Sequence, residues 1–188
     1  ARAIWEDVRQ QRAAQGASTI TQQFVKNATV AQGDRSVFQK LREAALAYHL
    51  ERQWSKDKIL TEYLNEIYFG EGATGVEAAA RTFFGGTPEH AGCGEGEDAI
   101  PCASELLPWE AALLAGMISS PSAYNPITNP EAALDRRNLV LQRMMEQGYI
   151  TEEEYTEYSD PELHPLPTEK QILPPREDSE APYFTSWL

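Results

Sequence analysis

Helix start and stop residues recur along this chain, and they restrict its fold more than any other feature. Ser18 and Ser55 are typical N-caps, while Gly85 and Gly148 are typical of the position just after a helix. Between such residues the apolar side chains follow helical spacing, and in residues 55–70 they form one wide stripe. No useful length of sequence alternates apolar and polar residues as a half-buried strand does. The sequence therefore predicts a mainly α fold.

Seven helices are expected within residues 1–158, which are enough for one domain with a single core. They cover approximately residues 18–30, 36–54, 55–70, 74–84, 108–118, 130–147 and 151–158. Residues 85–107 are rich in Gly, Pro and acidic side chains and are expected to form a loop. Six of the 12 prolines follow Asp160, which indicates an extended linker over residues 159–188.

Charge and hydropathy limit the function classes. The net charge of −13 argues against general nucleic-acid binding, which needs a basic surface. The longest apolar run, residues 111–118, is far shorter than the ~20 residues of a membrane-spanning helix. The first residues, 1–11, are polar and helix-like and do not resemble a signal peptide. Any membrane anchor is therefore expected outside these 188 residues.

One face of the first expected helix is polar yet almost uncharged. Thr19, Gln22, Gln23 and Lys26 are spaced i, i+3, i+4 and i+7, so they lie on the same side of the helix. One interpretation is an ordinary solvated surface. The other is the wall of a polar cleft that offers one cation to an anionic ligand.

The second expected helix carries further charged residues at close spacing. Arg35 precedes it, and Lys40 and Glu43 lie three positions apart on one side. A surface ion pair would explain this spacing and would contribute little. However, the alanines around Glu43 keep the helix thin there, which permits close packing and a recessed carboxylate. A recessed carboxylate near cations is a candidate catalytic or ligand-orienting group.

Arg137 lies in an apolar stretch of the sixth expected helix. Its neighbours three and four positions away are Ala133, Leu134, Val140 and Leu141. Such an arginine either extends to the surface or finds a buried partner. A structural role and a direct ligand contact are both open.

Cys93 and Cys102 are the chain's two cysteines and lie nine positions apart. They are either free thiols or, in an oxidising compartment, a local disulfide. No second Cys or His pair accompanies them, so they do not form a zinc motif. Phosphate-binding loops and metalloprotease or nucleophile-elbow motifs are also missing.

Three stretches resemble motifs of the peptidoglycan glycosyltransferases. GASTITQQFVKN, residues 16–27, resembles the second motif, residues 34–70 resemble the third and fourth, and residues 136–144 resemble the fifth. The order and gaps agree, and the resemblance covers about residues 2–158. The ending APYFTSWL, residues 181–188, resembles the entry into the linker that precedes a transpeptidase domain. It favours the class A penicillin-binding proteins over stand-alone transferases.

The resemblance implies a lysozyme-like helical fold that works on the outer face of the bacterial cytoplasmic membrane. It implies polymerisation of glycan strands from lipid II, with inversion and release of undecaprenyl pyrophosphate. The implied partners are lipid II, the lipid-linked glycan strand, the membrane surface and a C-terminal transpeptidase domain. No cofactor is expected to be required, and assistance by a divalent cation is left open.

The resemblance also assigns roles to individual residues. Lys26 and Arg35 match residues that bind the pyrophosphate, and Glu43 matches an acidic catalytic residue near the leaving group. The residues expected to bind substrate are Ser18, Gln23, Lys26, Asn27, Arg35, Lys40 and Arg137. The implied oxidising compartment favours the disulfide between Cys93 and Cys102.

The sequence departs from the family pattern in three places. The first motif, which supplies the expected general-base glutamate, is not in these residues, so the 188-residue chain alone is expected to be inactive. Gln39 stands where the family usually has Arg, and the loop containing the two cysteines is longer than in many members. Two other functions are open: a lytic enzyme of the same fold, which has no need of pyrophosphate-binding cations, and a non-catalytic docking module.

Overall fold

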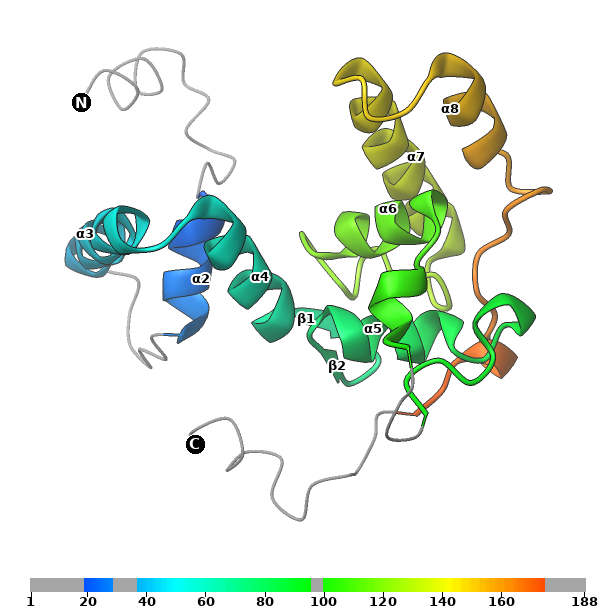
Figure 1. The fold of residues 1–188 in the computed structure, drawn as a ribbon, viewed down its shortest axis with the longest axis horizontal. Coiled ribbons are helices and arrows are strands. Elements are labelled where there is room, and N and C mark those ends of the chain that lie inside the picture. Colours follow the sequence, from blue (N-terminus) through cyan, green and yellow to red (C-terminus); the bar gives the residue numbers. More distant parts are fainter. Residues whose placement is uncertain (1–18, 29–36, 96–99, 175–188) are drawn as a thin grey trace. The chain divides into compact units, whose positions relative to one another are not determined.

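The structure is a computed structural model, and it describes residues 19–28, 37–95 and 100–174 (Figure 1). The chain divides into two compact units, residues 1–66 and residues 67–188, and each is described by itself. Seven α-helices and two very short strands account for most of the described residues. The predicted mainly α fold is therefore confirmed.

The first unit contains three described helices, and α2 packs against both of the others. Their bounds are α2 (Ile20–Ala28), α3 (Val37–Gln53) and α4 (Lys56–Glu66). Phe24 and Val25 of α2 are buried, and so are Ile59 and Tyr63 of α4. The Phe24 ring centroid lies 6.1 Å from that of Trp54, at the end of α3. These apolar contacts form the core of the described part of the unit.

The second unit begins with a small hairpin and continues through short helices. Its elements are β1 (Tyr68–Gly70), β2 (Ala73–Thr74), α5 (Val76–Phe84), η1 (Pro88–His90), η2 (Cys102–Glu105), α6 (Pro108–Met117), α7 (Pro130–Glu146), α8 (Glu152–Tyr158) and η3 (Glu169–Gln171). The two strands pair antiparallel. The sequence predicts a helix that continues through this region to Gly70, but α4 ends at Glu66. Two strands of three and two residues are too short to show an alternating pattern.

Helices α6 and α7 pack closely and form the core of the second unit. Gly116 of α6 permits this approach, because a Cβ atom there would lie 3.0 Å from Cγ of Arg136 and 3.5 Å from its backbone carbonyl. Leu114 and Met117 of α6 and Leu141 of α7 are fully buried at this contact. α6 is apolar around most of its circumference, which explains why it lies inside the unit.

Much of the predicted linker is packed onto the second unit. The backbone N–H of Leu173 donates to the carbonyl of Thr82 at 2.9 Å, and Nη1 of Arg81 donates to the carbonyl of Pro174 at 2.9 Å. Pro167 is buried. Residues 159–174 are not extended throughout, because they contain a turn at 161–163 and the short helix η3, and residues 173 and 174 lie against α5.

Candidate functional site

Glu43 on α3 is a buried carboxylate with one cation beside it. Only 6% of Glu43 is exposed, and Nζ of Lys40 lies 3.3 Å from its Oε2 atom. The Lys40 side chain is 61% exposed. The carboxylate is thus recessed, as the small neighbouring alanines predict, while its partner ammonium group lies at the surface.

Helix α2 has buried residues in its middle and exposed polar residues near its C-terminal end. Thr21, Phe24 and Val25 are buried and attach the helix to its unit, whereas Lys26 and Asn27 are exposed. The exposed ammonium and amide groups are accessible to a ligand. This end of α2 can therefore offer a cation and a hydrogen-bonding group without unfolding its core.

Gln23, also expected to bind substrate, is positioned by a contact from α4. The Tyr63 hydroxyl donates to Oε1 of Gln23 at 2.8 Å. Tyr63 is only 4% exposed, and burial raises the pKa of its phenol, so the hydroxyl keeps its proton. The sequence did not show this contact, because it joins residues 40 positions apart.

Two expected site residues, Ser18 and Arg35, lie outside the described residues. The expected convergence of Lys26 and Arg35 on Glu43 therefore stays a prediction. The residues that the structure does bring into one unit on adjacent helices are Gln23, Lys26, Asn27, Lys40 and Glu43.

Arg137 is buried in the second unit and donates hydrogen bonds to its backbone. It is 1% exposed, and its Nη1 and Nη2 atoms donate to the carbonyls of His164 at 2.6 Å and Ser159 at 3.3 Å. Its Nε donates to Oδ1 of Asn138 at 3.3 Å. These contacts support the structural alternative, and the expected contact of Arg137 with substrate stays a prediction. The guanidinium attaches residues 159–164 to α7.

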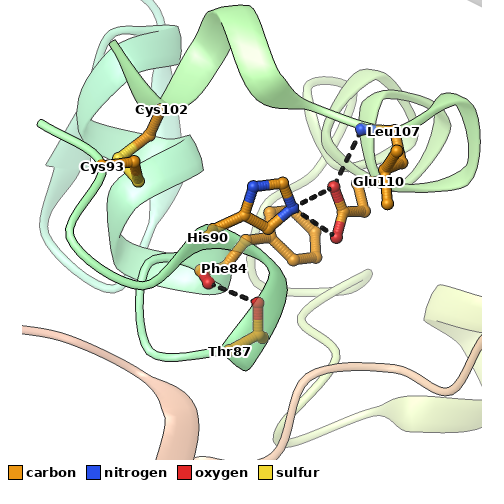
Figure 2. A network of polar contacts seen from close by, with 7 residues as sticks. All are labelled: Phe84, Thr87, His90, Cys93, Cys102, Leu107 and Glu110. Carbon is orange, nitrogen blue, oxygen red and sulfur yellow. Dashed lines mark hydrogen bonds and ion pairs between the residues drawn. A yellow bond between two sulfur atoms is a disulfide. The ribbon is translucent and has the colours of Figure 1, made fainter. Parts of the chain in front are cut away.

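A buried histidine–glutamate pair connects η1 to α6 (Figure 2). Nε2 of His90 lies 2.8 Å from Oε2 and 3.0 Å from Oε1 of Glu110. Glu110 also accepts a hydrogen bond of 2.9 Å from the backbone N–H of Leu107, so it caps the first turn of α6. His90 and Glu110 lie 20 positions apart in the sequence. A glutamate three positions after Leu107 was the available signal for the cap, but nothing local indicated the histidine.

Cys93 and Cys102 are joined by a disulfide in the structure. Both cysteines are buried, at 7% and 1% exposure. Glu77 of α5 accepts hydrogen bonds from the backbone N–H groups of Cys102 at 2.9 Å and Ala103 at 2.8 Å. The disulfide and the Glu77 carboxylate together fix the loop to α5.

The described part of the chain bears on two further questions, metal binding and membrane insertion. It contains no group of three or more His, Cys, Asp or Glu side chains that could bind a metal ion. Within the same residues, no helix combines the length and the apolar composition needed to cross a membrane.

Comparison with known proteins identifies the family. The family model described as Transglycosylase matches residues 1–145. The chain belongs to the transglycosylase family. Glu43, Lys40 and the exposed end of α2 all lie inside the matched part of this transglycosylase sequence.

The relatives of this transglycosylase chain are penicillin-binding proteins. Penicillin-binding protein 1A of Aquifex aeolicus is 47% identical over 156 residues, which cover 83% of this chain and 19% of that protein. Penicillin-binding protein 1A/1B of Bacillus subtilis is 44% identical over 76% of this chain and 14% of that protein. A crystal structure of penicillin-binding protein 1A from Haemophilus influenzae is 30% identical, with a TM-score of 0.42, over 73% of this chain and 16% of that chain. The chain thus spans less than a fifth of the length of these relatives.

Proposed function

We propose that this transglycosylase chain polymerises peptidoglycan glycan strands from lipid II. The observation that supports this most is the recessed Glu43 carboxylate beside Lys40, on a helix that packs against α2. Family membership gives the reaction type, and the residues on these two helices have the chemistry that it needs.

The proposed reaction joins two sugars and releases a pyrophosphate. The 4-hydroxyl oxygen of lipid II attacks C1 of the lipid-linked glycan, a new C–O bond forms, and the bond from C1 to the pyrophosphate oxygen breaks. The hydroxyl proton passes to a general base, and the electron pair of the broken bond leaves with undecaprenyl pyrophosphate. Cations near the leaving oxygen stabilise the charge that develops there.

Lys26 and Arg35 are the proposed cations for the pyrophosphate. Lys26 is exposed at the C-terminal end of α2, where an extended anionic ligand can reach it. Asn27 and Gln23 add hydrogen-bonding groups on the same helix. Arg35 precedes α3 in the sequence, which is consistent with a second cation close to the first.

Glu43 is proposed to act near the leaving group, with Lys40 limiting the cost of its buried charge. Burying an unpaired carboxylate is expensive, so a catalytic carboxylate needs a partner cation or a hydrogen-bond donor. Lys40 supplies this from the surface at 3.3 Å. The pair then presents a fixed negative group beside the proposed site of charge separation.

The proposed cellular location follows from the proposed substrate. The substrate is anchored in a lipid bilayer, so the enzyme is proposed to act at the outer face of the cytoplasmic membrane and beside a transpeptidase domain. No cofactor is proposed as a requirement. The general-base motif is not among the 188 residues, so we propose that this segment alone polymerises nothing.

The proposal is tested with a lipid II polymerisation assay on a chain extended upstream through the first motif. Lys26→Ala is expected to lower the rate by at least about 10²-fold, because it removes a cation from the developing charge. Lys58→Ala is the control, since Lys58 is another exposed lysine of the same unit, 4.2 Å above the Trp54 ring. Equal activity of the two variants would contradict the proposed role of Lys26.

The same assay addresses the rival functions. A lytic enzyme would shorten preformed glycan strands without consuming lipid II, and a docking module would do neither. The unextended chain, assayed in parallel, tests its proposed inactivity. If it polymerises as well as the extended one, a residue within the 188, such as Glu43, acts as the base.

A further inference from the structure

The amide of Gln23 on α2 is in contact with a buried hydroxyl of α4. Oε1 of Gln23 accepts a hydrogen bond of 2.8 Å from the Tyr63 hydroxyl. Tyr63 is 4% exposed, so its ring belongs to the core of the unit and its hydroxyl has a fixed position. Burial raises the pKa of this phenol, so the O–H group remains a donor.

This contact determines which end of the amide is presented on each side. A glutamine amide has an acceptor oxygen at one end and two N–H donors at the other. Rotation about its last torsion is broad and roughly two-fold, so an amide without a fixed partner exchanges these ends. A donor at Tyr63 favours the oxygen on the α4 side. The Nε2 group, with both of its N–H bonds, then lies on the other side of the amide.

The residues beside Gln23 on α2 make this polarity important. Lys26 and Asn27 follow it by three and four positions, so all three lie on one side of the helix. Lys26 and Asn27 are exposed and Gln23 is half-buried. An anion at Lys26 is attracted by N–H donors next to the cation and repelled by a carbonyl oxygen in the same place.

Helix α2 is held in its unit by other contacts. Phe24 and Val25 are buried, and Oγ1 of Thr21 donates to Oε1 of Glu51 on α3 at 2.7 Å. Loss of the Tyr63 hydroxyl would therefore leave the helix in place. It would free only the amide of Gln23 to rotate.

We propose that Tyr63 is a positioning residue that holds the N–H groups of Gln23 toward the pyrophosphate of the substrate, beside Lys26. The identity of this ligand rests on the proposed function. Tyr63 acts through Gln23 and does not contact the ligand. Its hydroxyl sets the site to present donors, and thereby favours an anionic group over a neutral or cationic one.

A mutant cycle on the affinity for inorganic pyrophosphate tests the proposal, measured by isothermal titration calorimetry on the 188-residue chain at low salt. Gln23→Ala is expected to weaken binding about tenfold, because it removes a hydrogen bond to a charged group. Tyr63→Phe, which keeps the ring, is expected to weaken it about threefold or more. In the Gln23→Ala background Tyr63→Phe is expected to have no further effect. A merely structural tyrosine would weaken binding by the same factor in both backgrounds.

Two further variants serve as controls. Tyr48→Phe makes the same chemical change at a 60% exposed tyrosine of α3 and is expected to leave the affinity unchanged. Gln23→Glu keeps an acceptor for Tyr63 but replaces the two N–H donors by a carboxylate oxygen. It is expected to weaken binding by at least about tenfold.

Four results would each overturn the positioning role: no binding by the unaltered chain, full affinity in Tyr63→Phe, full affinity in Gln23→Glu, or equal factors in the two backgrounds. Lipid II polymerisation by the extended chain is measured in parallel. If that chain polymerises nothing while the cycle gives the expected pattern, the proposed function fails and the positioning role stands. If it polymerises while the cycle is additive, the positioning role fails and the proposed function stands.

Discussion

Replacing Arg137 with Met is expected to destabilise the second unit and release residues 159–174 from it. Arg137 is almost fully buried, and its guanidinium is the donor for the carbonyls of His164 and Ser159. Met keeps much of the aliphatic volume but has no donor. The substitution therefore leaves two partly buried carbonyl oxygens without this partner, while the packing of α7 is largely kept.

The magnitude follows from the three hydrogen bonds. The 2.6 Å bond from Nη1 to His164 is short and charge-assisted, and such bonds contribute about 1.5–3 kcal/mol. The two bonds of 3.3 Å contribute less, roughly 0.5 kcal/mol each. Burial lowers the pKa of Arg137, so desolvation of the cation offsets part of this gain. A net loss of about 3 kcal/mol is expected, or roughly 6–12 °C in the melting temperature of a chain of this length.

The assay is denaturant unfolding of the full chain combined with limited trypsin digestion at Lys170. Arg143→Met is the matched control, because Arg143 lies on the same helix with a 64% exposed side chain and pairs only with Glu146 among the described residues. It is expected to change stability by less than about 0.5 kcal/mol. Faster cleavage at Lys170 is expected for the Arg137 variant only. Unchanged stability and cleavage, together with lost polymerisation in the extended chain, would refute the structural role and restore the substrate contact.

Two further results are expected. Cys93→Ser with Cys102→Ser is expected to lower the free energy of unfolding by about 2–3 kcal/mol, the chain-entropy value for so short a loop, measured by denaturant unfolding. The backbone N–H of Thr151 and the Thr151 side chain, through their hydrogen bonds, lower the pKa of Glu154 below its usual 4.5. The stability that this cap contributes is therefore present above that value and is lost as the pH falls through the folded-state pKa. Carboxyl titration by NMR is expected to show Glu154 titrating below its usual value of 4.5, and titration at or above that value would contradict the expectation.

Local signals predicted most helices because each acts within a few residues. The Ser55 side chain accepts from the backbone N–H of Lys58 at 3.2 Å, so the predicted N-cap of α4 is present. Gly148, with φ of +76°, follows α7 where the sequence indicated a stop. The packing of residues 159–174 was not predictable in this way. It depends on hydrogen bonds to Thr82 and Arg81, which lie more than 80 positions earlier.

In the candidate site, too, local features were predictable from the sequence and long-range contacts were not. The burial of Glu43 and the exposure of Lys26 follow from helical spacing and small neighbours, which the sequence displays. Other side chains form hydrogen bonds with residues that are distant in the sequence. Tyr63 contacts Gln23, and Glu110 contacts His90. Arg137 shows the consequence. Its apolar neighbours indicated an unusual arginine, but the carbonyls that it contacts, at residues 159 and 164, lie more than 20 positions away in the sequence.

The negative charge of the chain is unevenly distributed along the sequence. Residues 1–66 contain 10 Lys and Arg against 8 Asp and Glu, a net charge of +2, whereas residues 67–188 contain 6 against 21, a net charge of −15. The acidity therefore belongs to the second unit, and the unit that carries Lys26, Arg35 and Lys40 is slightly basic. Charges separated by more than about 8 Å are largely screened at physiological salt. Added salt is expected to weaken the proposed binding of pyrophosphate, because it screens the attraction between the anion and the cations of residues 1–66.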